Sequence, residues 1–253
     1  IASDAISHDF ETAVLLGLEW GIEHFELKRV HDTRRIAEAT EEDLKKVEQV
    51  LHKNMVRISS LSPGIFKEPL KQETILKEFD RFEKTIVIAH KLRVRKIIIF
   101  SFERTPDLTI DQAIPQIEDA IGHLVRRAEA EGVTLLLEND RGLWVDTPET
   151  LKQIMSSINS QALKINWDPC NLLAAYPQPP YPYGYNLIKK WIGHVHIKDA
   201  KAKGIGEFSH AMVGEGDLDW AGQFGALINS KFKGLCVLEP HFGSRISSSR
   251  EHL

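Results

Sequence analysis

Four residues whose side chains commonly bind metals follow one another along the second half of the chain. They are Glu138, Asp168, His196 and Glu239, separated by 30, 28 and 43 residues. Each stands in or directly after a short β-rich run. If these runs are parallel strands of one barrel, their carboxyl ends meet and the four side chains point to a common place. Three carboxylates gathered there repel one another, and a divalent cation removes that cost.

Taken singly, each of these residues has a plainer explanation. An Asp or Glu after a strand is commonly a helix cap or a loop carboxylate, and a lone His is commonly a hydrogen-bonded core residue. His194 lies two residues before His196, so strand alternation puts both on one face and spacing does not choose between them. The joint arrangement nevertheless predicts a metal centre. Its oxygen-rich ligands suit Mn²⁺, Mg²⁺ or Co²⁺, and Zn²⁺ accepts such mixed sites.

The elements that must position these residues alternate along the chain, with helical stretches between short β-rich runs. This alternation is typical of a parallel sheet covered by helices. A count of eight runs favours a closed barrel over an open doubly wound sheet. No Gly-x-Gly-x-x-Gly follows the first run, which weakens a dinucleotide-binding interpretation. The predicted strands are Ile1–Ile6, Ile22–Leu27, Met55–Ser59, Lys96–Phe100, Val133–Glu138, Leu163–Asp168, His194–Lys198 and Leu235–Glu239.

Helix boundaries are marked by capping residues. Thr40 and Thr147 are expected at N-caps, the second followed by a Pro in the first turn. Gly132, Gly193 and Gly234 each precede a predicted strand, where a helix C-cap glycine belongs. The sequence therefore predicts an α/β fold, a single (β/α)8 TIM barrel over residues 1–253. Its final helix is expected to be absent or truncated, because few residues follow the last strand.

Composition excludes several classes of protein. The chain has 253 residues, 42% of them hydrophobic and 27% charged, which is ordinary for a globular domain. A net charge of −4 gives no general attraction to nucleic acid or to an anionic membrane. The two cysteines, Cys170 and Cys236, form no close pair, and no apolar run is long enough for a bilayer. We therefore expect a cytoplasmic protein without nucleic-acid or membrane partners.

Several strand-end motifs stand out together: Leu137-Glu138-Asn139, Trp167-Asp168-Pro169-Cys170-Asn171, Gly193-His194-Val195-His196-Ile197-Lys198-Asp199, Val213-Gly214-Glu215-Gly216 and Leu238-Glu239-Pro240. They resemble motifs of the xylose-isomerase-like barrels. That superfamily includes sugar and sugar-phosphate isomerases and epimerases, hydroxypyruvate isomerase, inosose isomerases and dehydratases, and the endonuclease IV enzymes. The resemblance implies that Glu138, Asp168, His196 and Glu239 are the metal ligands, and it selects His196 over His194.

The resemblance also implies a reaction. In superfamily members that isomerise sugars, two glutamate ligands move protons while the metal polarises the substrate. The matching residues are Glu138 and Glu239. Removal of a proton from the substrate gives a cis-enediolate stabilised by the cation. Return of a proton to a neighbouring carbon isomerises the substrate, whereas return on the opposite face by the other glutamate epimerises it. We expect a metal-dependent sugar isomerase or epimerase with one divalent ion, Mn²⁺ favoured. The expected partner is a small polyhydroxy carbonyl substrate, and the sequence is compatible with a homo-oligomer.

The residues around the expected ligands differ from those of ketose 3-epimerases. Asn171 stands where those enzymes carry a His, Ala202 where they carry an Arg, and Trp144 where they carry a second Glu. A free ketose 3-epimerase is therefore not favoured. We expect Asn171, Lys198, Trp144 and His241 to bind substrate. Lys198 could meet a carboxylate or phosphate, and Trp144 could form an apolar wall. Solvation, capping or packing would explain them as well.

Other roles compete with this one. The same metal and base could expel a β-hydroxyl as water, as inosose and dehydroshikimate dehydratases do, and nothing in the sequence separates that lyase from an isomerase. A DNA-repair endonuclease of the same fold needs histidines where this chain has Ser59-Ser60 and Phe100-Ser101. Its three-metal cluster therefore cannot be assembled. A barrel that only binds a ligand is disfavoured by the complete ligand set.

Overall fold

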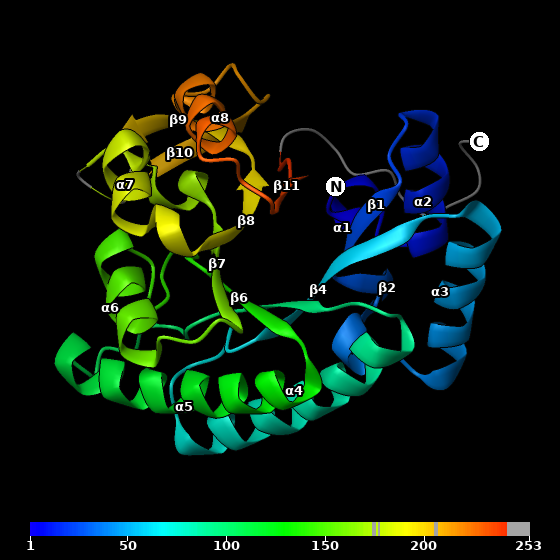
Figure 1. The fold of residues 1–253 in the computed structure, drawn as a ribbon, viewed down its shortest axis with the longest axis horizontal. Coiled ribbons are helices and arrows are strands. Elements are labelled where there is room, and N and C mark those ends of the chain that lie inside the picture. Colours follow the sequence, from blue (N-terminus) through cyan, green and yellow to red (C-terminus); the bar gives the residue numbers. More distant parts are fainter. Residues whose placement is uncertain (174–175, 177, 205–206, 242–253) are drawn as a thin grey trace.

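One parallel seven-stranded sheet surrounded by helices forms the core of the structure, a computed structural model that describes residues 1–173, 176, 178–204 and 207–241 (Figure 1). Its strand order is β1-β4-β5-β6-β7-β8-β11, which is the sequential arrangement of a TIM barrel. The sheet strands are β1 (His24–Leu27), β4 (Arg57–Ile65), β5 (Lys96–Ile99), β6 (Thr134–Glu138), β7 (Leu163–Trp167), β8 (Ile192–Ile197) and β11 (Leu235–Leu238). Two antiparallel hairpins lie outside the sheet: β2 (Arg29–His31) with β3 (Arg34–Arg35), and β9 (Asp199–Gly204) with β10 (Glu207–Ala211).

Helices cover the outside of the sheet. They are α1 (Ser3–Ile6), α2 (Phe10–Glu19), α3 (Glu41–Asn54), α4 (Gln72–Lys91), α5 (Ile110–Glu131), α6 (Pro148–Ile158), α7 (Tyr185–Ile188) and α8 (Trp220–Asn229). The predicted N-caps are confirmed: Thr40 caps α3 and Thr147 caps α6, each in a reciprocal capping box. None of the described helices is long and apolar enough to cross a membrane.

Only one of the three predicted C-cap glycines ends a helix. Gly132 is the left-handed C-cap of α5, with φ of 65°. The prediction is wrong for Gly193, which lies inside β8, and for Gly234, because the C-cap of α8 is Ser230. Gly193 has another reason to be glycine, since a Cβ there would lie 2.8 Å from the Cβ of Lys164 on the neighbouring strand β7.

Ile1 and Ala2 close the barrel between β1 and β11, in place of a full strand, and the carbonyl of Ile1 accepts a hydrogen bond from the amide of Glu26 at 2.8 Å. Ala2 pairs in parallel with Glu26 of β1, and its amide donates to the carbonyl of Leu238 in β11 at 2.8 Å. In Figure 1 the amino terminus lies between these two strands. The predicted strand over Ile1–Ile6 is therefore wrong beyond Ala2. From Ser3 the chain forms the short helix α1, which ends at Ile6, and α2 begins at Phe10.

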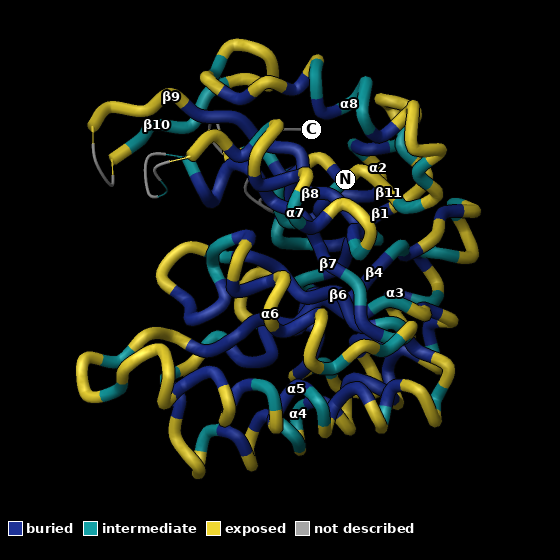
Figure 2. Tube along the Cα trace, turned by 60° about the vertical axis from the view of Figure 1, so that its left-hand side comes forward, coloured by how far each residue is buried: buried dark blue, intermediate teal, exposed yellow. Residues whose placement is uncertain are grey.

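The central strands of the sheet are buried on both faces, which explains their nearly continuous apolar sequences. Ile97, Ile98 and Ile99 of β5 are all fully buried. Figure 2 shows buried strands inside a shell whose exposed residues lie on the outer helical surface. One face of each strand lines the barrel and the other meets a helix, so neither face favours polar residues. Polar side chains in the strands therefore need a specific explanation.

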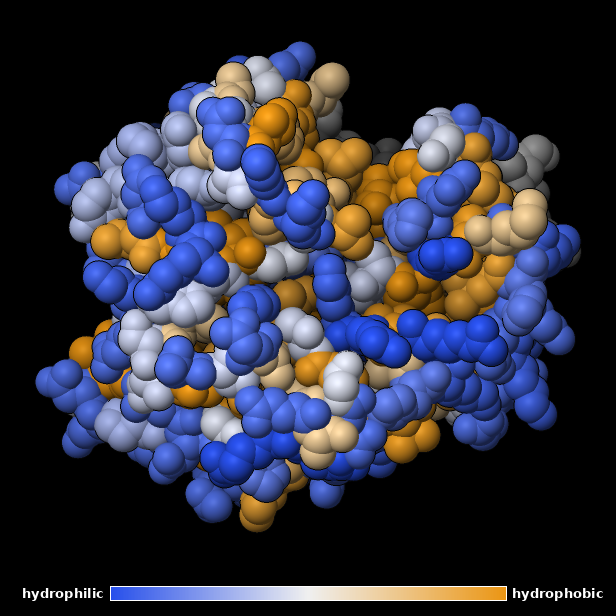
Figure 3. Space-filling model, in the orientation of Figure 1, coloured by the Kyte–Doolittle hydropathy of each residue, from blue (hydrophilic) through white to orange (hydrophobic). Residues whose placement is uncertain are grey.

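Strand β11 is less well covered than the other sheet strands, with three of its four residues exposed. Leu235 and Leu238 are 37% and 40% exposed. In Figure 3 apolar surface gathers around the notch between the side that carries α8 and the side that carries α2. The prediction that the final helix is absent or truncated concerns residues 243–253, which lie outside the described residues.

The packing of α2 on β1 predicts a stability effect at Gly17. A Cβ at this position would lie 2.6 Å from Cζ of Phe25, whose ring is fully buried and packed edge-on against Phe10. We expect Gly17→Ala to lower the free energy of unfolding by about 1–3 kcal/mol, because the ring must move inside a close-packed core. Urea or thermal unfolding measures this change.

The matched control is Gly225→Ala in α8, where a new Cβ meets nothing within 4 Å. This substitution should stabilise the protein by about 0.5–1 kcal/mol, because alanine loses less backbone entropy than glycine when a helix forms. Equal effects of the two substitutions would contradict the packing described for Gly17.

Candidate metal centre

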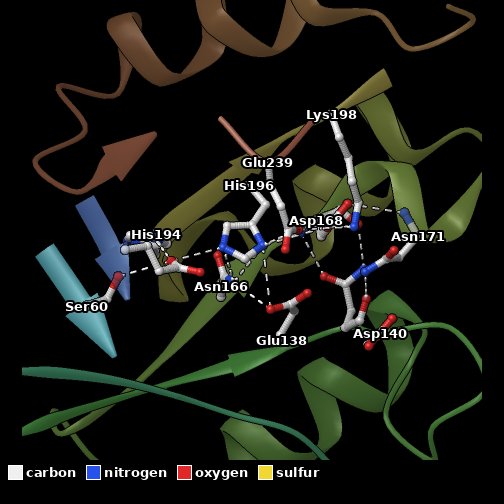
Figure 4. A network of polar contacts seen from close by, with 12 residues as sticks. Ser60, Glu138, Asp140, Asn166, Asp168, Asn171, His194, His196, Lys198 and Glu239 are labelled. Carbon is white, nitrogen blue, oxygen red and sulfur yellow. Dashed lines mark hydrogen bonds and ion pairs between the residues drawn. The ribbon is translucent and has the colours of Figure 1, made fainter. Parts of the chain in front are cut away.

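The four predicted ligands meet at the carboxyl ends of four consecutive strands. Glu138 ends β6, Asp168 follows β7, His196 lies in β8 and Glu239 follows β11. All four are buried, and one ligand atom from each lies within 4.8 Å of the others. Figure 4 shows the imidazole of His196 beside the carboxylates of Glu138 and Glu239, with Asp168 nearby. The predicted convergence of these side chains is confirmed.

The imidazole of His196 faces all three carboxylates through one nitrogen. Its Nδ1 lies 3.1 Å from Oε2 of Glu239, 3.6 Å from Oε2 of Glu138 and 3.9 Å from Oδ2 of Asp168. Burial alone would lower the pKa of His196, but the charges of Glu26 and Glu138 outweigh it and raise that pKa to about 9. The carboxylates thus hold positive charge among them. A divalent cation supplies positive charge too, and three oxygens with one imidazole nitrogen form a suitable donor set.

The other nitrogen of His196 contacts a residue that sequence reasoning missed. Oε2 of Glu26 in β1 lies 3.1 Å from Nε2 of His196 and 3.3 Å from Nε2 of His194, and it accepts a hydrogen bond from Ser60. In the described part of the chain, Glu26, His194 and His196 form a second group close enough to hold a metal. In the sequence, the signal for Glu26 was a carboxylate between two large apolar residues, Phe25 and Leu27, near the end of a β-rich run.

Further contacts fix the carboxylates. Oδ1 of Asp168 accepts hydrogen bonds from the amides of Cys170 and Asn171, which leaves Oδ2 toward His196. The side chain of Asn139 bridges β6 and β7 by bonding to both the amide and the carbonyl of Asp168. Asn166 donates to Oε2 of Glu138 at 2.9 Å. The positions of the Glu138 and Asp168 carboxylates are therefore set by hydrogen bonds within the fold.

The predicted substrate-binding residues have different surroundings. Lys198 is buried in the centre, 2.7 Å from Asp168, and His241 lies at its edge, with Nε2 3.9 Å from Oε2 of Glu239. Asn171 is buried and donates its side-chain amide to a backbone carbonyl. Trp144 packs in the hydrophobic core. Substrate binding stays a prediction for all four.

Two further lysines approach the centre and were not singled out from the sequence. Nζ of Lys28, just after β1, contacts Oε1 of Glu239. Nζ of Lys67, just after β4, lies 2.6 Å from Oδ2 of Asp140 and 4.0 Å from the centre of the Phe100 ring. In the sequence, the signal that could have identified both lysines was their position after a predicted strand.

Known protein families and curated proteins include relatives of this chain. The family model described as the xylose isomerase-like TIM barrel matches residues 15–253. The chain belongs to this family. An inosose dehydratase from Bacillus thuringiensis (strain Al Hakam) is 22% identical over 155 residues, which cover 54% of this chain and 50% of that protein. The chain thus spans about half the length of the curated relatives it matches.

Solved structures share the fold of this xylose isomerase-like barrel. The IOLI protein, solved with a binding zinc atom, superposes with a TM-score of 0.77 at 16% identity over 92% of this chain and 87% of that one. The 3-keto-D-glucoside 4-epimerase YcjR from E. coli gives a TM-score of 0.71 at 15% identity over 94% and 88%. At these identities the likeness shows the fold alone.

A hairpin follows β8 in this family member and is anchored at its base. Oδ2 of Asp199 accepts hydrogen bonds from the amides of Gly214 and Gly216 at 2.9 and 3.1 Å. A Cβ at position 216 would lie 1.9 Å from Oδ1 of Asp199, so only glycine fits. On β10, His210 stacks on His241 with ring centroids 5.0 Å apart. The hairpin therefore lies beside the Glu239 edge of the centre.

The contact between Glu26 and His196 predicts an effect on metal affinity. A carboxylate that fixes the second nitrogen of a ligating histidine orients the ring and increases its basicity. We expect Glu26→Gln to weaken Mn²⁺ binding by about 10–100-fold. Isothermal titration calorimetry on the folded variant measures this affinity.

The control is Glu23→Gln, an exposed residue three positions earlier, which should bind Mn²⁺ like the wild type. Wild-type Mn²⁺ affinity in a folded Glu26→Gln protein would show that Glu26 does not position His196 for metal binding.

Proposed function

We propose that Glu138, Asp168, His196 and Glu239 bind one divalent cation and that the chain is a metal-dependent isomerase or epimerase. Its substrate would be a sugar, a sugar phosphate or a related hydroxy-carbonyl compound. The observation that carries this proposal is the convergence of the four buried donor groups within 4.8 Å. The oxygen-rich donor set favours Mn²⁺, with Mg²⁺, Co²⁺ and Zn²⁺ as alternatives. The zinc of the IOLI protein is consistent with this range.

Two glutamates flank the proposed site. Glu138 belongs to β6 and Glu239 follows β11, the outer two of the four strands that supply ligands. When bound, the cation supplies Lewis-acid polarisation of the substrate carbonyl. One glutamate removes the proton from the carbon beside that carbonyl, which gives an enediolate. Return of the proton to the former carbonyl carbon, with transfer of the adjacent hydroxyl proton to the former carbonyl oxygen, isomerises the substrate. Delivery of a proton by the other glutamate to the opposite face of the original carbon epimerises it.

A dehydratase is the second candidate. The observation that favours it is the sequence match to inosose dehydratases. The first step is shared, because removal of the proton beside the carbonyl leaves electrons that can expel a β-hydroxyl group. With a proton from the site, that group leaves as water and a carbon–carbon double bond forms. Both candidates therefore require the same glutamates.

Solvent-deuterium exchange tests both candidates together. Keto sugars, inososes and hydroxypyruvate are incubated in D₂O with the Mn²⁺-loaded protein, and NMR follows deuterium at each carbon. We expect exchange at the carbon beside the carbonyl of the true substrate. Glu138→Gln and Glu239→Gln should slow it by about 10²–10⁴-fold, because each removes a proton-transfer group.

Glu19→Gln, at the exposed end of α2, is the control and should exchange at the wild-type rate. Near-normal turnover by either glutamate variant would exclude the role assigned to that residue. If no compound exchanges deuterium and the protein binds no divalent metal, the proposed function is wrong.

A further inference from the structure

Two lysines from different strands contact the same carboxylate of the metal centre. Nζ of Lys28, after β1, contacts Oε1 of Glu239, whereas Nζ of Lys198, after β8, lies 3.3 Å from Oε2. Lys198 also lies 2.7 Å from Oδ2 of Asp168. Glu239 follows β11, and the barrel closes between β11 and β1 through Ala2. The two ammonium groups therefore reach one glutamate from the strands on its two sides.

These ammonium groups have little water to compensate their charge. The side chain of Lys198 is 7% exposed and that of Glu239 is 6% exposed, whereas Lys28 keeps 22% exposure. A buried ammonium group is stable only when anionic or polar partners replace its lost hydration. For Lys198 the carboxylates of Asp168 and Glu239 are those partners. Lys28 is the more accessible of the pair and opens toward solvent.

The substrate class inferred from these lysines rests on the proposed function. Glu239 and Asp168, which compensate the two ammonium groups, also belong to the proposed ligand set. A divalent cation that shares these carboxylates would draw on the same negative charge and repel the lysines. Lys67 is less affected, because Asp140 at 2.6 Å is its partner and is not a ligand. Lys28 and Lys198 are thus the cations that need a new anionic partner in a loaded site.

We propose that the substrate carries a permanent anionic group, a carboxylate or a phosphate, beside its hydroxy-carbonyl unit, and that Lys28 and Lys198 bind that group. An anion next to the two ammonium groups restores the charge balance that the metal disturbs. The site therefore selects anionic hydroxy-carbonyl compounds over neutral keto sugars and neutral inososes. Lys28, being partly exposed, is placed to meet the anion as it enters, and buried Lys198 contacts it inside.

Calorimetry with unreactive ligands tests this substrate class without relying on activity. Mn²⁺ affinity is measured first, and the loaded protein is then titrated with glycerate, glycerol 3-phosphate and glycerol. We expect at least one of the two anions to bind at least about tenfold more tightly than glycerol, because a charge-assisted contact is worth at least that factor. Glycerate and glycerol 3-phosphate distinguish a carboxylate from a phosphate.

The lysine variants make the test specific. Lys28→Met and Lys198→Met should each bind the preferred anion at least about tenfold more weakly and bind Mn²⁺ as tightly as the wild type or more tightly. The opposite directions arise because each lysine attracts the anion and repels the metal. Lys28→Arg keeps the charge at the more exposed position and should retain anion binding. If Lys198→Met does not fold, the comparison of Lys28→Met with Lys28→Arg still tests the inference. Lys152→Met, on the exposed surface of α6, is the control.

The outcomes separate this inference from the proposed function. Failure of the wild-type protein to bind Mn²⁺ overturns the proposed function and this inference with it. Mn²⁺ binding with deuterium exchange, but with equal anion affinity in the wild type and Lys28→Met, overturns the anionic substrate alone. If the loaded protein binds glycerol more tightly than both anions, the anionic substrate is likewise overturned.

Discussion

Negative charge is concentrated at the mouth of this barrel, and the neighbouring residues are arranged around it. Glu138, Asp168 and Glu239 are buried together, where like charges repel more strongly than in water. The parallel strands impose this crowding, because each delivers its terminal side chain to the same end of the barrel. His196 and Lys198 contact carboxylates from within the mouth, and Lys28 does so from its rim. The charge pattern is thus a consequence of the topology.

Hydrogen bonds from neighbouring residues hold the side chains of the centre in place. Asp168 is held by two backbone amides and by Asn139, Glu138 accepts a hydrogen bond from Asn166, and His196 contacts Glu26. These groups restrain ligand positions, so that repulsion between the carboxylates is opposed by geometry built into the fold. Pre-organisation of this kind is what metal sites and proton-transfer sites require.

The strand ends and the four converging side chains of Glu138, Asp168, His196 and Glu239 could be predicted because local sequence patterns indicate them. A run of apolar residues with a carboxylate at its end marks both a strand and the direction of its last side chain. Contacts between distant strands leave no such pattern. Glu26 meets a histidine 170 positions later, and Lys28 meets Glu239 across 211 positions. The predicted strand at Ile1–Ile6 failed for the same reason, since closure depends on bonds from Ala2 to two distant strands.

The attachment of the β9–β10 hairpin has a consequence for how such a barrel can change. Asp199 joins the base of the hairpin to the segment after it through backbone amides, so the attachment is indifferent to the side chains that β9 and β10 carry. Apart from Asp199 and the buried Ala200, the residues of β9 can change without breaking these backbone hydrogen bonds. Evolution or laboratory loop exchange can therefore alter the exposed part of this hairpin while the buried groups on the barrel strands keep their positions.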